Sequence, residues 1–324
     1  MLSRQPAALG CVCGIAISWV ASTQLSQTLV SGEASGANLF LVWFSTNFNV
    51  MLVALLWSTQ PRHLSLRRTT TWGGQELPIQ KLLRAAMMLY PLWMGANYLY
   101  VRALGLTSAA TATAVFSTTP AVVAVLSRLL LKESFHARKV GAVVLAIAGV
   151  LCVDLAPTVA RTGADVAAGD VDTAAADTAV AVGLASVAAL CAGSYKVVLR
   201  LLLGETSAPP VAVYLSCLGG INIAFGAPLV LAFHLTGFEV VPPMATLPWE
   251  FLIASALLHL VFNFLINFGI AFTSPLFISL GIDLQARVQG HGAACLPPIQ
   301  HAIHQFHDRS YGAGCATRFM QARF

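Results

Sequence analysis

Long hydrophobic runs separated by short polar stretches make up most of the chain. A helix needs about 20 apolar residues to cross the hydrocarbon core of a bilayer, whereas a strand of a transmembrane barrel shows about ten residues of alternating polarity. The runs here are continuous, so they predict membrane-spanning α-helices. We expect eight spans, at about residues 9–30, 38–58, 85–104, 108–131, 140–155, 178–202, 210–235 and 249–272.

A ninth hydrophobic segment, residues 274–282, breaks off after nine residues and is too short to span. Asp283 and Arg287 follow closely, and then come Pro297-Pro298 and several histidines. No later run is long and apolar enough to cross a membrane. We therefore expect residues 283–324 to form a divergent, disordered, cytoplasmic tail, whose histidines reflect chance composition more often than a metal site.

Composition supports this interpretation, because 57% of the residues are hydrophobic and only 10% are charged, whereas soluble chains carry about 25% charged residues. We expect a multi-pass integral membrane protein of the Golgi, the endoplasmic reticulum or the plasma membrane. The net charge of +5 is spread over the loops and forms no basic stripe, which argues against nucleic acid as a partner. The seven cysteines form no CxxC pair.

The loop charges predict how the chain is oriented. The loop at residues 59–84 holds five basic residues against Glu76 alone, and the turn around Lys132 is also basic. The positive-inside rule places both on the cytoplasmic side, together with the N-terminus. The acidic loop at residues 156–177 then lies on the opposite side.

This acidic loop also divides the spans into two sets. Five spans precede it, and an odd number of crossings inverts the second set relative to the first, which is a common plan in transporters. We expect a first five-helix repeat (1–155), a non-cytoplasmic linker loop (156–177), an incomplete second repeat (178–282) and the tail (283–324).

Several short motifs occur in an order that resembles the drug/metabolite transporter superfamily, and within it solute carrier family 35, subfamily F, which includes thiamine transporter-like members. The motifs are Asn97-Tyr98-Leu99-Tyr100, Ser194-Tyr195-Lys196-Val197, Leu247-Pro248-Trp249, Asn267-Phe268-Gly269-Ile270-Ala271 and Ser279-Leu280-Gly281-Ile282. The resemblance covers most of the chain up to Ile282. It implies an all-α membrane protein, a polytopic helix bundle of two inverted repeats with 5+5 helices, of which about eight and a partial ninth are present here.

The chain departs from the family pattern in two places. The match stops at Ile282, where the resemblance implies two more helices, so we expect a truncated chain. In the fourth span, Thr111 and Pro120 stand where the subfamily has an acidic and a basic residue, which leaves the substrate open.

Lys196 is the main candidate for binding a solute, because a charged residue inside a span costs about 2.5–3.5 kcal/mol and usually faces the interior of the bundle. It is suited to an anionic group of the substrate. The alternative is that Lys196 and Arg200 both extend to the cytoplasmic interface. A thiamine-like cation would instead need aromatic side chains, because the intramembrane carboxylates, Glu33 and Asp154, lie near helix ends.

His259, Asn263 and Asn267 recur every four residues and therefore share one face of the eighth helix. They line a polar cavity or form hydrogen bonds between helices. The same two alternatives hold for Asn97, Tyr98 and Tyr100 of the third helix and for Asn222. We favour the cavity for Asn97 and helix-to-helix bonds for Asn222. The candidate substrate-binding residues are Lys196, Tyr195, Asn97, Tyr98, Tyr100, His259, Asn263 and Asn267.

We find no HExxH, GxSxG or Walker motif and expect no enzyme, no cofactor and no metal. The function that we expect is transport of a small organic solute, a thiamine-like vitamin or related metabolite, by alternating access of the two repeats, with the truncated form inactive. The alternative is a non-transporting membrane protein that is degraded or that associates with full-length relatives. The expected partners are the solute, the lipid bilayer and a second copy of the chain.

Overall fold

The computed structural model describes residues 5–32, 36–59, 68–70, 76–131, 171–204 and 206–272. Four predicted features lie outside the described residues: the fifth helix at 140–155, the linker loop up to residue 170, the short ninth helix and the tail.

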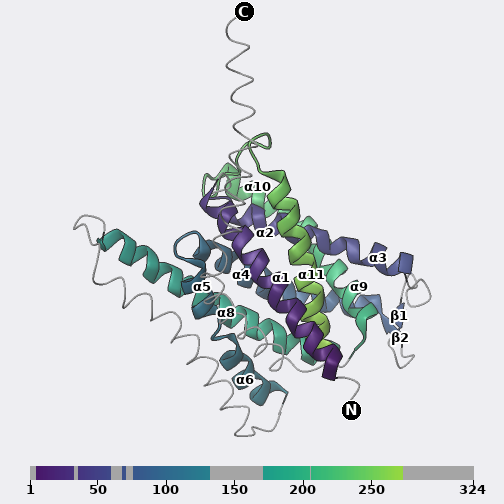
Figure 1. The fold of residues 1–324 in the computed structure, drawn as a ribbon. Coiled ribbons are helices and arrows are strands. Elements are labelled where there is room, and N and C mark those ends of the chain that lie inside the picture. The colour runs from purple at the N-terminus through teal and green to yellow at the C-terminus, as the bar shows by residue number, and fades with distance from the viewer. Residues whose placement is uncertain are drawn as a thin grey trace, which may run out of the picture.

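The described part of the chain is almost entirely helical (Figure 1). Its α-helices are α1 (Gln5–Ser31), α2 (Asn38–Asn47), α3 (Met51–Thr59), α4 (Ile79–Leu104), α5 (Ala109–Phe116), α6 (Thr119–Leu130), α8 (Val171–Leu203), α9 (Ala208–Ile221), α10 (Ala227–Leu235) and α11 (Trp249–Phe272). Two short antiparallel strands, β1 (Arg68–Thr70) and β2 (Glu76–Pro78), precede α4.

Three of the predicted spans are helices with an irregular turn inside. A 3₁₀ turn, η2 (Phe48–Val50), joins α2 to α3, and a π-helical turn, η4 (Asn222–Gly226), joins α9 to α10. Between α5 and α6 the helix breaks at Ser117 and Thr118, just before Pro120. Proline has no backbone N–H and its ring clashes with the preceding turn, which explains why the helix breaks just before Pro120.

Five described segments are long and apolar enough to cross a membrane, and the protein is an integral, multi-pass membrane protein. They are residues Asn38–Thr59, Ala109–Leu130, Ala176–Leu203, Ala208–Leu235 and Trp249–Ala271. The helices α1 and α4, with 27 and 26 residues, coincide with two further predicted spans, and their crossing of the membrane stays a prediction.

Helices α4 and α8 begin well before the predicted starts of their spans. Helix α4 begins at Ile79 instead of residue 85, because Pro78 sets its start and Lys81 and Arg84 are accommodated in its first turns. Long basic side chains on a helix can extend to water. A charged residue therefore interrupts a hydrophobic run in the sequence without interrupting the helix. Helix α8 begins at Val171 instead of 178 and includes the last residues of the expected loop.

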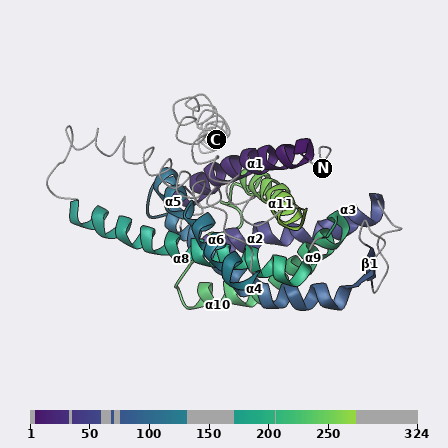
Figure 2. The same ribbon diagram turned by 90° about the horizontal axis from the view of Figure 1, so that it is seen from below.

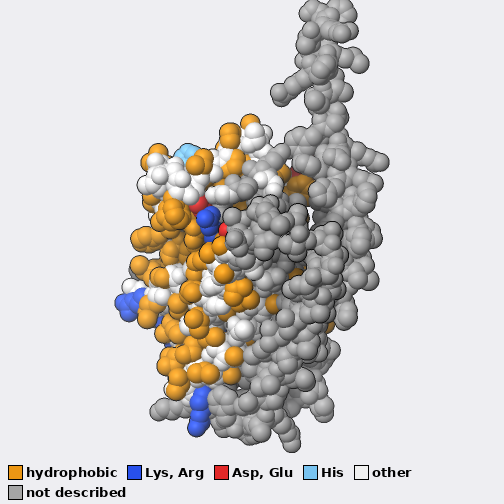
Figure 3. Space-filling model, turned by 90° about the vertical axis from the view of Figure 1, so that its left-hand side faces the viewer, with side chains coloured by type: hydrophobic (Ala, Val, Ile, Leu, Met, Phe, Trp, Pro, Cys, Tyr) orange, Lys and Arg blue, Asp and Glu red, His pale blue; other side chains and the backbone are white. Residues whose placement is uncertain are grey.

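The helices pack in two long pairs (Figures 1 and 2). Helix α4 lies along α8 and also contacts α9, while α1 lies along α11. The main hydrophobic core lies between these pairs and includes residues of α1, α4, α5, α8, α9 and α11. On the face shown in Figure 3, the described side chains are mostly apolar and few are charged, as a lipid-facing surface requires.

Candidate functional site

A cavity of about 50 Å³ lies inside the core, where five helices meet. Its wall is formed by Trp19 of α1, by Trp93, Ala96, Asn97 and Tyr100 of α4, by Phe116 of α5, by Ala192, Tyr195 and Lys196 of α8, and by Phe262 and Ile266 of α11. Four of the eight candidate residues, Asn97, Tyr100, Tyr195 and Lys196, are therefore brought together here. The structure does not place the other four in this wall.

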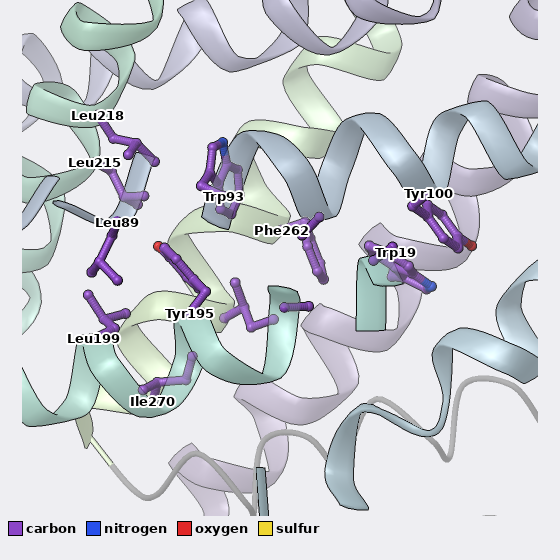
Figure 4. Packing of buried hydrophobic residues seen from close by; sticks show 14 of the residues in the cluster. Trp19, Leu89, Trp93, Tyr100, Tyr195, Leu199, Leu215, Leu218, Phe262 and Ile270 are labelled. Carbon is purple, nitrogen blue, oxygen red and sulfur yellow. The ribbon is translucent and has the colours of Figure 1, made fainter. Parts of the chain in front are cut away.

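Aromatic rings dominate the cavity (Figure 4). Trp19 is in contact with Tyr100, Phe116 and Phe262, at ring-centroid distances of 5.2, 5.6 and 4.8 Å. Across the wall, the ring of Trp93 lies 5.3 Å from that of Tyr195. Such rings stack on flat solutes and attract cations over their faces.

Lys196 is the one charged residue among the residues that line this cavity, and only 4% of it is exposed. Its burial does not fit the alternative in which its side chain extends to the interface. Arg200, one turn later, behaves differently. It donates hydrogen bonds to the carbonyl oxygens of Gly204 and Ala271, at 3.1 and 2.7 Å, and so holds the C-terminal ends of α8 and α11 together.

His259 lines a second, smaller cavity of about 30 Å³. Its polar wall consists of Ser26, Ser45, Asn97, Ser255 and His259. Asn97 also lines the main cavity, so the two cavities are neighbours at this residue. The His259 ring lies 6.0 Å from Trp93, which belongs to the wall of the main cavity. His259 is therefore next to the main site and outside its wall.

Asn263 and Asn267 are fully buried and form hydrogen bonds within and between helices. The side chain of Asn267 accepts a bond of 2.7 Å from the Tyr195 hydroxyl, which itself accepts one of 3.2 Å from the Tyr214 hydroxyl. The amide of Asn263 donates to the side chain of Asn49 at 3.5 Å. These bonds favour the structural alternative for both asparagines.

Tyr98 points away from the cavity and donates a hydrogen bond of 3.0 Å to Glu239. Glu239 lies between α10 and α11 and is 3% exposed. Its carboxylate also accepts bonds from the Asn38 side chain and the Leu39 backbone, and lies 3.6 Å from the Arg102 guanidinium. Sequence reasoning missed Glu239. Residues 206–249 contain no other Asp, Glu, Lys or Arg, and this isolation could have marked Glu239 as a functional candidate.

The other wall residues that sequence reasoning missed are apolar. Trp19, Trp93, Phe116 and Phe262 have no property that separates them from core residues in the sequence, because aromatic side chains are common in any helix bundle. Only the geometry, which places rings from four helices around one space, identifies them as a group.

Comparison with known proteins shows that the chain is similar to solute transporters. Residues 7–154 match the EamA-like transporter family. The chain is also 32% identical over 287 residues to solute carrier family 35 member F3 of mouse and of human, and 28% identical over 268 residues to member F4 of mouse. The resemblance to subfamily F is thereby confirmed, and these relatives are solute carriers rather than enzymes.

The matched region covers 86% of this chain and 63% of member F3, so the chain spans less than two thirds of that relative. For mouse member F4 the shares are 80% and 52%. A solved crystal structure superposes with a TM-score of 0.48 at 17% identity, covering 90% of this chain and 97% of that one.

Proposed function

We propose that the protein transports a small organic solute, and that the aromatic cavity is the place where the solute binds. The observation that carries this proposal is the convergence of five helices on one interior space, with six aromatic rings, one amide and one buried lysine in its wall. Binding sites of transporters lie in the interior of the bundle where its two halves meet. The match of residues 7–154 to the EamA-like transporter family supports the same conclusion.

The cavity as it stands is too small for an organic solute, because about 50 Å³ is far below the roughly 300–1,000 Å³ of pockets that hold small organic ligands. A solute therefore enters only when helices move apart. This supports transport by alternating access, in which the described arrangement is an occluded state and the two inverted repeats open in turn on either side.

The wall favours a solute with a flat ring, such as a thiamine-like vitamin or a related metabolite, stacked between the Trp19 and Trp93 sides of the cavity. The charge of the solute depends on Lys196, since no carboxylate is among the residues that line the cavity. The ammonium favours an acceptor or anionic group, and Asn97 supplies a further polar partner.

Uptake into proteoliposomes tests the proposal. Lys196→Met keeps the length of the side chain and removes its charge, so saturable uptake of the transported solute should fall about ten-fold or more, since a charge-assisted bond is among the strongest in a binding site. Leu201→Met in the same helix is the control, because Leu201 is 52% exposed on the outer surface. Its uptake should equal that of the unaltered chain.

The panel should contain thiamine, a neutral ring analogue and an anionic one of similar size. If the Lys196→Met variant takes up the solute as fast as the unaltered chain, Lys196 does not bind the solute. Complete lack of saturable uptake across the panel, by a folded unaltered chain, would favour the non-transporting alternative.

A further inference from the structure

The second cavity is next to the main cavity and lies nearer to one end of the bundle. Asn97 lines both spaces, and on the far side of the second cavity lie Leu29, Leu41, Val101 and Leu252. These residues are close to the end of α1, the start of α2, the end of α4 and the start of α11. The same end of the bundle therefore contributes a residue from each of four helices.

A compact apolar cluster lies at this end, and three of its residues, Leu29, Leu41 and Leu252, line the second cavity. We call it the plug, and it consists of Leu29, Val30, Ala37, Phe40, Leu41, Leu247 and Leu252, all buried. The plug joins helices that belong to the first half of the chain, α1 and α2, to the segment before α11 and to α11 itself, in the second half. Any motion that separates the halves at this end has to open it.

Glu239 fastens the plug from the outside of the second cavity. It belongs to the segment between α10 and α11, in the second half, whereas all four of its partners belong to the first half. The Leu39 N–H and the Asn38 amide, at 2.8 and 3.2 Å, tie it to the start of α2. The Tyr98 hydroxyl at 3.0 Å and the Arg102 guanidinium at 3.6 Å tie it to the end of α4.

The electrostatics of this contact favour a negative charge. The first turn of a helix has unpaired N–H groups and a positive dipole end, and α2 has no side-chain cap of its own at Ala37. The Glu239 carboxylate therefore caps α2 from another part of the chain. If the carboxylate of Glu239 is removed, its hydrogen-bond donors lose their acceptor. Because this position is buried, water replaces that acceptor poorly.

We propose that the second cavity is the part of the solute path between the main cavity and this end of the bundle, and that Glu239 is the latch that keeps the plug closed over it. The proposal rests on the proposed function for the identity of the path. The latch itself is a property of the chain without solute and is tested in that state.

The test measures how fast a cysteine in the second cavity reacts with a hydrophilic thiol reagent. Ser255→Cys places the reporter in the wall of that cavity, where Ser255 is 7% exposed. The full chain is placed in nanodiscs, which expose both ends, and mass spectrometry reads labelling at position 255 separately from the native cysteines. In the Glu239→Ala background, we expect labelling to accelerate about ten-fold or more, as the loss of a buried charged partner implies.

Glu250→Ala is the matched control, because it removes an exposed carboxylate at the start of α11 and at the same end of the bundle. It should leave the labelling rate unchanged. The proposal is overturned if Ser255→Cys is labelled at the same rate with Glu239→Ala as with Glu239 in place. Circular dichroism and size exclusion must show that both proteins are folded.

A second variant keeps the test decisive where Glu239→Ala does not fold. Tyr98→Phe removes one hydroxyl and leaves the Leu39 and Arg102 contacts of Glu239 in place. A smaller, measurable rise in labelling supports the latch, and an unchanged rate refutes it. Because no solute is present, a refuted latch leaves the proposed transport function intact, and a failed uptake assay leaves the labelling result valid.

Discussion

At the scale of single residues, polar side chains in this bundle divide into those that line a space and those that join helices. Asn222 is of the second kind: its amide donates to the Trp43 carbonyl oxygen at 2.9 Å and to the Asn47 side chain at 2.7 Å, and it accepts a bond from the Tyr90 hydroxyl at 3.2 Å. The sequence favoured this role for Asn222. For Asn263 and Asn267 the spacing left both roles open, because helical periodicity fixes a shared face and says nothing about what lies opposite.

Replacing Asn222 tests how much this joint contributes. Interhelical hydrogen bonds in membranes contribute about 0.6 kcal/mol on average, with a maximum near 1.7, so Asn222→Ala should lower the free energy of unfolding by about 1–3 kcal/mol. Ile223→Ala, at the neighbouring and 46% exposed position, should change it much less. Unfolding in mixed micelles measures both, and equal losses would show that the three bonds contribute little.

At the scale of helices, close contact depends on glycines that the hydrophobic pattern does not reveal. A Cβ at Gly219 of α9 would lie 2.9 Å from the Val50 Cγ2 and 3.0 Å from the Val50 backbone nitrogen. The adjacent Gly220 has no atom within 4 Å of such a Cβ. Small residues let helices approach closely in membranes, yet two neighbouring glycines look the same in the sequence and only one lies at the contact.

This pair provides an internal comparison. Gly219→Ala should destabilise the protein by about 1–3 kcal/mol, because the new methyl group forces α9 away from η2. Gly220→Ala should be neutral or stabilising by up to about 1 kcal/mol, since alanine has the higher helix propensity. Thermal unfolding in detergent measures both variants. Equal destabilisation would contradict the close contact of α9 with Val50.

At the scale of the whole molecule, the sequence predicted spans well wherever apolar runs are continuous. The span at 249–272 coincides with α11, and the span at 38–58 differs from α2 to α3 by one residue. The early starts of α4 and α8 could not be predicted from hydropathy. The first turns of α4 contain basic side chains, and those of α8 belong to an alanine-rich, acidic segment, so in both cases the helix begins before the apolar run does. The cavity could be predicted only in part, since its polar residues stand out in the sequence and its aromatic ones do not.

Orientation in the membrane is testable on residues that the structure describes. The loop charges predict that Thr59, at the end of α3, is cytoplasmic and that Thr246, before α11, lies on the opposite side. Both are exposed. In sealed cells or vesicles, an impermeant thiol reagent should label only one of Thr59→Cys and Thr246→Cys, and permeabilisation should expose the other. Labelling of both before permeabilisation would reject the predicted topology.

Two side-chain contacts join α8 to α11 on either side of Lys196. The Tyr195 hydroxyl donates to the Asn267 side chain, and the Arg200 guanidinium donates to the Ala271 carbonyl oxygen. Helix α8 also lies along α4, so the wall residues Lys196 and Tyr195 are held from both sides. Under the proposed function, any motion that enlarges the cavity by moving α8 has to break one of these two contacts, and the bonds of Tyr195 and Arg200 then set the cost of separating α8 from α11.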